Sequence, residues 1–220
     1  MKNKKDAIDS FKRRLTKKHC NEFDNNQLLV PGRIFMFENW TGVHEAEIIL
    51  YDKENLTVQF RNLFYNIEEI WTLDNLFIFD EEYLKTICAQ AEDYGLLTDD
   101  KWKNENYIMD AGVYILHNDN KPIDRGYYTG QAKGKSGGLS GRLCDHVKNE
   151  DSKIDKAIKE NEPFSLKVIK LANTDYEEIN ALEVALIAYY KSWDNWNKDG
   201  YNANRGPNCA GERAITKELL

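Results

Sequence analysis

Residues 111–130, AGVYILHNDNKPIDRGYYTG, predict a β-hairpin near the middle of the chain. The first seven residues are rich in β-branched, aliphatic and aromatic side chains, which favour a strand. The segment NDNKPID then carries the asparagine, aspartate and proline residues that are typical of turns. GYYTG reads as a second strand, and a connection this short makes the two strands antiparallel.

The segments after the hairpin predict a sheet flanked by helices. GRLCDHV (141–147) begins a helix, SKIDKAIKE (152–160) is a second helical piece, and FSLKVIKL (164–171) is a third strand. Strands and helices that do not alternate regularly are typical of the α+β class. The expected fold class is therefore α+β, with a three-stranded antiparallel sheet flanked by helices in residues 106–220.

A long helix is expected over residues 174–193, TDYEEINALEVALIAYYKSW. Thr174 or Asp175 can cap its first turn, and the glutamates that follow favour the positive end of the helix dipole. Its apolar stripe consists of Ile179, Leu182, Leu186 and Tyr190. Glu183 is an acid in the middle of this apolar run, which makes it a candidate for a functional role.

The first half of the chain predicts a separate, smaller unit. Residues 28–80 contain short runs rich in β-branched or aromatic residues, with turn-forming segments between some of them, as in a small barrel. Residues 81–94 look helical because apolar side chains recur on one helical face, and Gly95 is a natural stop. The next segment reads as a linker, so we place a domain boundary near residue 106, after a small barrel-like domain of residues 19–105.

The charge of the chain is unevenly distributed. Residues 1–18 hold 8 basic and 2 acidic side chains, residues 19–110 hold 6 and 19, and residues 111–220 hold 16 of each. We expect residues 1–18 to be a basic arm, either a solvated, frayed terminus or an arm that contacts phosphates and releases their counterions. The acidic segment is a poor surface for DNA. The sequence has no apolar run of about 18 residues, so no contact with a membrane is expected.

Five features of the second half resemble the GIY-YIG family of nucleases, in the order in which that family has them. Gly112-Val113-Tyr114 and Tyr128-Thr129-Gly130 are similar to its paired strand motifs, with the two tyrosines 14 positions apart. The other three features are Arg142 with His146 four residues later, Glu183 in ALEVALI and Asn202 in GYNANRG. The resemblance covers roughly residues 111–206 and implies a metal-dependent endonuclease.

The resemblance and the chemistry of these side chains give each a part in phosphodiester hydrolysis. Tyr114 accepts a proton from the attacking water, Tyr128 positions that water or the phosphate, and Arg142 binds the phosphate with its planar guanidinium. His146 shares the proton transfer or bonds a tyrosine oxygen. Glu183 holds one Mg²⁺ ion per active site, which Mn²⁺ can replace, and the metal acts as a Lewis acid. Nearby positive charge is expected to favour the phenolate form of Tyr114.

The loop after the second strand, QAKGKSGG, supplies further candidates for phosphate contact. Lys133 and Lys135 can hold phosphates while the glycines let backbone amides approach an anion. Asn202 is grouped with them as a DNA or phosphate contact, although the family gives it a largely structural part. Gly112 and Gly130 belong to the strand motifs and are expected to be structural.

Residues 44–79 resemble a Tudor-type barrel, a weaker resemblance that covers about forty residues. In that family an aromatic cage holds a methylated cation by cation–π attraction. The candidate walls of such a cage here are Trp40, Phe64, Tyr65 and Trp71. The alternative is that these aromatic side chains are simply the core of a small barrel.

The expected function is a type II restriction endonuclease that cuts double-stranded DNA at a specific sequence, because the Arg142–His146 pair is similar to the restriction branch of the family. Two cuts in opposite strands need two sites, so a homodimer or a dimer formed on DNA is expected. The four cysteines form no paired motif and no secretory signal is present, so the expected location is the cytoplasm. The alternatives are a homing or repair-type nicking endonuclease, and a modified-protein-binding module with a scaffold nuclease domain.

Overall fold

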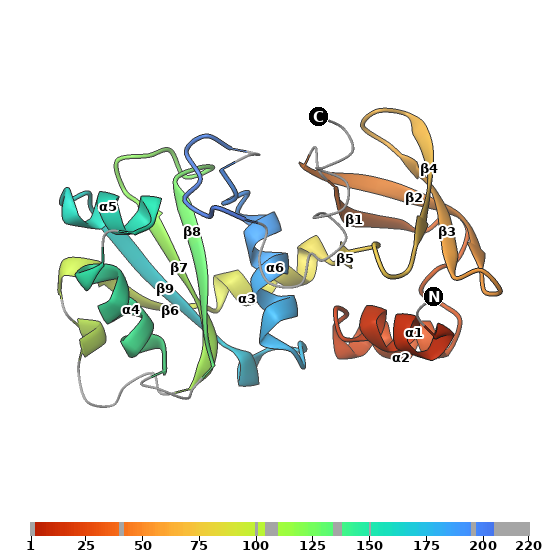
Figure 1. The fold of residues 1–220 in the computed structure, drawn as a ribbon, viewed down its shortest axis with the longest axis horizontal. Coiled ribbons are helices and arrows are strands. Elements are labelled where there is room, and N and C mark those ends of the chain that lie inside the picture. Colours follow the sequence, from red (N-terminus) through yellow and green to blue (C-terminus); the bar gives the residue numbers. More distant parts are fainter. Residues whose placement is uncertain are drawn as a thin grey trace.

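The computed structural model describes residues 3–39, 42–99, 101–103, 110–133, 138–149, 151–194 and 197–204. In this part of the chain the fold is α+β, built from two antiparallel sheets and the helices that pack on them. Figure 1 shows the sheets at opposite ends of the molecule, with α3 (Glu81–Ala89) and α6 (Ile179–Tyr189) between them. The fold class expected from the sequence is confirmed at this level.

The first sheet comes from the N-terminal half, and its described strands are joined in the order β4-β3-β2-β1-β5. They are β1 (Ile34–Asn39), β2 (Gly42–Asp52), β3 (Thr57–Asn62), β4 (Ile67–Thr72) and β5 (Ile78–Phe79). Tight turns join β2 to β3 and β3 to β4, where Leu56 and Asn66 both have a φ of 53°. Buried and half-buried residues alternate along β3, as expected of a strand with one face on a core. The short strands predicted over residues 28–80 are therefore present.

The basic segment, residues 1–18, is folded against the first sheet in its described part. It forms α1 (Lys4–Lys12) and the start of α2 (Lys17–Asp24). Phe11 and Leu15 are 0% and 3% exposed and lie in one apolar cluster with the inward side chains of the sheet. Arg14 donates to two backbone carbonyl oxygens just after β4. The expectation of a solvated terminus is therefore wrong, while contact between the exposed basic side chains and phosphates stays a prediction.

The helix expected over residues 81–94 is shorter than predicted. α3 ends at Ala89, and the residues that follow form β6 (Glu92–Leu96). β6 pairs with β9 (Phe164–Lys170) in the second sheet. The apolar residues of this segment have a helical spacing, but pairing with a strand that is distant in sequence overrides the local preference. The second sheet thus takes a strand from before residue 106, where the sequence suggested a domain boundary.

The second sheet has four strands within the described residues, where three were expected, and their order is β6-β9-β7-β8. β7 (Ala111–Asn118) and β8 (Tyr127–Lys133) form the predicted antiparallel hairpin, with Tyr114 opposite Gly130. β9 pairs with the other side of β7 and is also antiparallel to it. β8 is therefore an edge strand of this sheet. Side chains from the two faces of the sheet can approach each other around this edge.

Different helices cover the two faces of the second sheet (Figure 1). α4 (Gly138–Lys148) and α5 (Lys153–Lys159) share an apolar cluster with Tyr114 and Leu116 on one face. α3 and α6 cover the opposite face, where they pack against Val113 and its neighbours. The hairpin is thus held from both sides, and successive residues of each strand point into different clusters.

α6 is shorter than the helix expected over residues 174–193. Its N-cap is Glu178, which makes no side-chain capping bond, and the 3-10 turn η3 (Leu171–Asn173) precedes it. Residues 181–188 are all buried, so the helix packs on every side and not along one stripe. The other described 3-10 turns are η1 (Leu97–Asp99) and η2 (Lys101–Lys103). Neither α6 nor any other described helix is long and apolar enough to span a membrane.

The two sheets are joined through the helices that lie between them. Phe77 and Phe79, next to and within β5, belong to the same apolar cluster as Leu182 of α6. The backbone amide of Lys17, at the start of α2, donates to the carbonyl oxygen of Asp175 at 2.9 Å. The N-terminal half therefore packs against the side of the second sheet that α6 covers.

Candidate active site

The hairpin places Tyr114 and Tyr128 on the same face of the second sheet. Tyr114 is fully buried, and its ring centroid lies 6.0 Å from that of Tyr128. The preceding residue, Tyr127, points to the opposite face, where it packs with the ring of Tyr190. Strand alternation therefore decides which of the two adjacent tyrosines faces Tyr114, and it is the one that the sequence motif indicates.

Glycines at two positions let the strands and the Tyr114 ring approach closely. A Cβ atom at Gly130 would overlap the ring of Tyr114, which crosses the neighbouring strand at this point. A Cβ atom at Gly112 would lie 2.6 Å from the carbonyl oxygen of Ile169 on β9. Both glycines are therefore needed because a larger residue would not fit, which agrees with the structural part expected of them.

Two helices bring a histidine and a carboxylate to the buried hydroxyl of Tyr114. Nε2 of His146, on α4, lies 2.7 Å from the hydroxyl oxygen of Tyr114. Nδ1 of the same ring lies 2.5 Å from Oδ1 of Asp155 on α5. His146 and Asp155 are only 6% and 5% exposed. The expected bond between His146 and a tyrosine oxygen is present, and it is part of a longer chain of polar groups shielded from water.

Sequence reasoning misses Asp155, although a local signal surrounds it. Ser152 accepts a hydrogen bond from the backbone amide of Asp155, and the Asp155 carboxylate accepts one from the amide of Ser152. This reciprocal cap fixes the carboxylate at the first turn of α5. The S-x-x-D spacing predicts such a cap, but only the packing of α5 against α4 brings the other carboxylate oxygen to His146.

Burial and hydrogen bonding together set the protonation of this cluster. Burial lowers the pKa of His146 below its usual 6.5, although Asp155 works in the opposite direction. Burial tends to raise the pKa of Asp155, but hydrogen bonds with Ser152 and His146 outweigh it, and the pKa is lowered. At neutral pH the pair is therefore a neutral imidazole beside a carboxylate. Nδ1 then donates its proton to Asp155, and Nε2 accepts from the hydroxyl of Tyr114.

The phenolate form expected for Tyr114 is not favoured in this environment. Burial raises the pKa of Tyr114 well above its usual 10, and the neighbouring Tyr128 adds to the rise. Arg142 works in the opposite direction but has the weaker influence. Burial also raises the pKa of Tyr128. Both side chains are therefore neutral phenols in the free protein, because the loss of hydration outweighs the nearby positive charge.

Glu183 reaches the β8 edge of the sheet from α6. It is 7% exposed, and burial raises the pKa of its carboxyl group to about 7, against the opposing influence of Gln131 and Arg142. The side-chain amide of Gln131 donates to Oε2 of Glu183 at 2.8 Å. Oε1 of Gln131 is buried and has no hydrogen-bond partner among the described residues. Sequence reasoning misses Gln131, which directly follows the second strand motif.

Glu183 and Gln131 together fit a hard divalent cation. Mg²⁺ takes oxygen ligands and keeps several waters, so the Glu183 carboxylate is a suitable ligand, and the Gln131 amide, whose nitrogen faces this carboxylate, could add its oxygen by turning over. A cation there would satisfy the buried carbonyl oxygen of Gln131 and would favour the charged form of Glu183. Elsewhere in the described residues, no group of three or more histidine, cysteine, aspartate or glutamate side chains could hold a metal.

Arg142 lies on the exposed side of α4, at the solvent edge of the cluster. Its side chain is 52% exposed and pairs with Asp145 at 3.5 Å. Its charge acts to lower the pKa values of Tyr114, Tyr128 and Glu183, which places it within electrostatic reach of all three. Because the pair with Asp145 is exposed, it is a weak one, and a phosphate could replace the aspartate as partner.

Of the two lysines expected to hold phosphates, Lys133 is described and Lys135 lies outside the described residues. Lys133 ends β8 and is exposed to solvent. Its positive charge acts to lower the pKa of Glu183, so the two side chains lie near the same edge of the sheet. Lys133 therefore adds positive charge at this edge, which would favour a bound phosphate.

Asn202 fastens the loop after α6 to the hairpin. Its side-chain oxygen accepts from the backbone amide of Thr129 at 2.9 Å, and its side-chain nitrogen donates to the Thr129 carbonyl oxygen at 2.7 Å. The residue is 7% exposed. Contact with a phosphate would require the amide to leave both bonds, so this geometry favours a structural part for Asn202.

The candidate aromatic cage of the first sheet is divided between two environments. Phe64 and Tyr65, in the turn between β3 and β4, contact each other and the ring of His44. Phe64 is 74% exposed. Trp71 packs instead against two buried phenylalanines of the sheet core. Trp40 lies outside the described residues. Trp71 therefore has the core position of the alternative interpretation, while Phe64 and Tyr65 lie at the surface.

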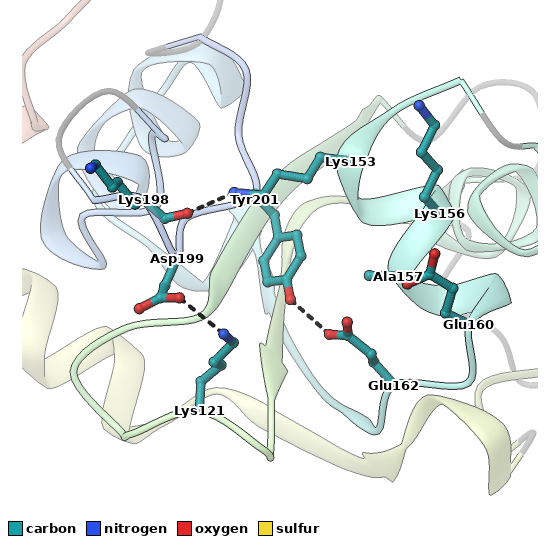
Figure 2. A pocket seen from close by; sticks show the side chains of 9 residues that line it. All are labelled: Lys121, Lys153, Lys156, Ala157, Glu160, Glu162, Lys198, Asp199 and Tyr201. Atoms are coloured by element: carbon teal, nitrogen blue, oxygen red, sulfur yellow. Dashed lines mark hydrogen bonds and ion pairs between the residues drawn. The ribbon is translucent and has the colours of Figure 1, made fainter.

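A pocket of about 310 Å³ lies between α5 and the loop that leads to Tyr201 (Figure 2). Two of its lysines are engaged, because Lys121 pairs with Asp199 at 3.0 Å and Lys153 donates to backbone carbonyl oxygens. Tyr201, near its centre, donates to Glu162 at 2.9 Å. The described residues that line this pocket include no member of the tyrosine and histidine cluster, so it is a separate feature.

No family model, curated protein or solved structure matches this chain. The interpretation of the site therefore rests on the geometry of its own residues. That geometry joins two tyrosines and a histidine–aspartate pair on one face of the sheet with a glutamate–glutamine pair at its edge.

Proposed function

We propose that the protein is a metal-dependent endonuclease that hydrolyses phosphodiester bonds of DNA with a GIY-YIG-type site. The main support is that Tyr114, hydrogen-bonded to His146, lies within electrostatic reach of Arg142 and Glu183. Hydrolysis of a phosphodiester needs a proton acceptor for water, a cation at the phosphate oxygens and help for the leaving oxygen. A different side chain of this cluster suits each of these needs.

In this proposal the tyrosines orient and deprotonate the attacking water, and Arg142 binds the phosphate. Tyr128, which is half-buried and hydrogen-bonded to Tyr114, orients the water and relays its proton to the buried Tyr114 as the oxygen approaches phosphorus. Arg142 exchanges Asp145 for two phosphate oxygens, which its planar guanidinium can bind at once. His146 is the hydrogen-bond partner that allows Tyr114 to pass a proton on.

In this proposal the cation binds beside the edge strand β8. The carboxylate of Glu183 would hold one Mg²⁺ ion, or Mn²⁺ in its place, and the amide of Gln131 would turn its oxygen toward the same ion. The bound ion would supply Lewis acidity toward the phosphate and the leaving oxygen. Lys133 adds a positive charge next to the DNA backbone, and Lys135 is proposed to act in the same way.

We further propose sequence-specific cleavage of double-stranded DNA of the type II restriction kind, in the cytoplasm. One chain holds one site, so a homodimer or two copies meeting on DNA would cut both strands. A homing or repair-type enzyme that nicks one strand is the alternative. The exposed Phe64 and Tyr65 favour one other candidate, in which a Tudor-like barrel binds a methylated cation and the nuclease half is a scaffold.

Supercoiled plasmid incubated with the protein and Mg²⁺ distinguishes these functions. A restriction enzyme is expected to give discrete fragments, a nicking enzyme to give open circles, and a binding module to leave the plasmid uncut. Sequencing the fragment ends then gives the recognition site and shows whether the products carry 5′-phosphates.

Glu183→Gln tests the metal site within the same assay. The change keeps the side-chain volume and removes the charge, so cleavage should fall by orders of magnitude while DNA binding is retained, since metal stabilisation of the transition state is worth several kcal/mol. The matched control is Glu177→Gln, which removes the same charge from an exposed position just before α6 and should cut normally. Cleavage by Glu183→Gln at the wild-type rate would show that the metal is held elsewhere.

A further inference from the structure

The two carboxylate oxygens of Asp155 have different partners. Oδ2 accepts from the backbone amide of Ser152 at 3.0 Å and completes the cap of α5. Oδ1 lies 2.5 Å from Nδ1 of His146. A helix cap requires neither the contact with His146 nor the burial of the carboxylate to 5% exposure, since capping groups are commonly at the surface. The second contact therefore points to a role beyond helix stability.

We propose that Asp155 is a positioning residue for the hydrolysis, one that holds His146 in the tautomer whose Nε2 can accept the proton of Tyr114. The inference rests on the proposed nuclease function. With its Nδ1 proton donated to Asp155, the ring keeps a lone pair on Nε2, 2.7 Å from the Tyr114 hydroxyl oxygen. Tyr114 then has no need to be a phenolate beforehand, because it accepts one proton while it gives up another.

The proton and electron changes balance along this chain of groups. As the water oxygen bonds to phosphorus, one water proton moves to the oxygen of the half-buried Tyr128, the Tyr128 proton moves to Tyr114, and the Tyr114 proton moves to Nε2 of His146. The bond between phosphorus and the 3′ oxygen breaks, and its electron pair leaves with that oxygen, which takes a proton from solvent. His146 becomes an imidazolium that the carboxylate of Asp155 stabilises, and it returns its proton to solvent before the next cycle.

The other groups that face His146 do not fix its tautomer. In the described residues they are Tyr114 on β7, Tyr128 on β8, Arg142 and Asp145 on α4, and Asp155 on α5. Arg142 disfavours the imidazolium, and both aspartates favour it. Of these groups, Asp155 is the one that bonds Nδ1, so it decides which nitrogen carries the proton.

Asp155→Asn changes this bond and keeps the shape of the residue. The asparagine oxygen can still accept from Ser152, which turns the side-chain NH₂ toward Nδ1 of His146. The ring must then carry its proton on Nε2, so Tyr114 loses its acceptor. We expect cleavage at neutral pH to fall by roughly 10²- to 10⁴-fold with DNA binding unchanged. The residual rate should climb with pH as hydroxide replaces the acceptor, whereas the wild-type rate levels off above the pKa of His146.

Two control variants separate this role from helix capping. Ser152→Ala removes the hydroxyl group from the cap and leaves the carboxylate on His146, so the melting temperature should fall by a few degrees with cleavage near the wild-type rate. Asp151→Asn removes a charge from an exposed position at the same end of α5 and should change neither quantity. If Asp155 acted only as a helix cap, each variant that weakens the cap, Ser152→Ala included, would lose stability and cleavage together.

Nitrogen-15 NMR of the imidazole measures the tautomer without DNA. The wild-type ring of His146 should carry its proton on Nδ1, and the ring in Asp155→Asn should carry it on Nε2. The wild-type spectrum by itself decides the tautomer, so the inference is testable if the variant does not fold or if the wild-type protein cuts no plasmid. A wild-type ring protonated at Nε2, or an Asp155→Asn variant that cuts at the wild-type rate at every pH, would overturn the inference.

Discussion

The carboxyl group of Glu183, on α6, is buried. The side-chain amide of Gln131 donates a hydrogen bond to it. A carboxylate in such a place is unfavourable without a charged partner, and the pKa of about 7 expresses that penalty. An amide or an apolar side chain would suit the free protein better. The buried carboxyl group therefore costs the free protein stability, as is common at functional positions, and the proposed cation would offset that cost.

Glu183→Gln is accordingly expected to stabilise the metal-free protein at high pH. The folded-state pKa of about 7 lies above the usual 4.5, so the unfolded chain releases a proton that the folded protein keeps between these values. Stability therefore falls as pH rises through this window, and the loss above it is at most about 3 kcal/mol. Urea denaturation in EDTA should show the variant more stable than the wild type near about pH 8, and equal to it below about pH 4.5.

The control for this prediction is Glu177→Gln, whose side chain is exposed. Its stability should match that of the wild type at both pH values, since an exposed carboxylate keeps its hydration. Equal stability of Glu183→Gln and the wild type at high pH would contradict the burial penalty. It would mean that the carboxylate is already hydrated or paired in the free protein.

Among the elements, those with a local cause were predictable and those with a distant partner were not. The β7–β8 hairpin lies within the contiguous residues 111–133, which contain both strands and their turn, so its signal is complete in the sequence. β6 was read as helix because its partner, β9, is far along the chain. Thr174 or Asp175 is the cap that the sequence predicts for the long helix, but α6 begins after Glu178, and the Asp175 carboxylate accepts from the backbone amide of Lys18 in the first turn of α2.

The same distinction applies to the candidate site. Tyr114, His146 and Glu183 could be found because their spacing along strands and helices forms a motif. Asp155 and Gln131 have no such spacing, since their roles come from contacts between separate elements: α5 against α4, and β8 against α6. The protonation states were likewise out of reach, because burial of each group depends on how those elements pack.

Phe11 offers a test of whether α1 is a docked element. Its ring is fully buried in the cluster that also contains the inward side chains of the first sheet. Phe11→Ala should lower the free energy of unfolding by about 3–5 kcal/mol in urea denaturation, because a cavity replaces the ring. The exposed neighbour Arg13, changed to alanine, should alter it by no more than about 0.5 kcal/mol. A small effect of both changes would restore the interpretation of this segment as a solvated arm.

At the scale of the whole molecule, the two halves share structure across the boundary that the sequence suggested. The second sheet takes β6 from the N-terminal side of residue 106. Its α6 face is covered by Leu84 and Ile87 of α3, together with Phe77 and Phe79. The acidic first half is therefore more than an appended module, since it supplies part of the core on which the candidate active site is built.

This arrangement predicts that a fragment of residues 106–220 does not fold, whereas a fragment of residues 77–220 does. The shorter fragment leaves one edge of β9 unpaired and exposes the apolar face of α6, and both features promote aggregation. The longer fragment keeps β6 and α3 and so keeps that face covered. Circular dichroism during urea denaturation should show a cooperative transition for the fragment 77–220 and none for the fragment 106–220. Equal, cooperative transitions in the two fragments would mean that the core closes without β6 and α3, and that residue 106 is a true domain boundary.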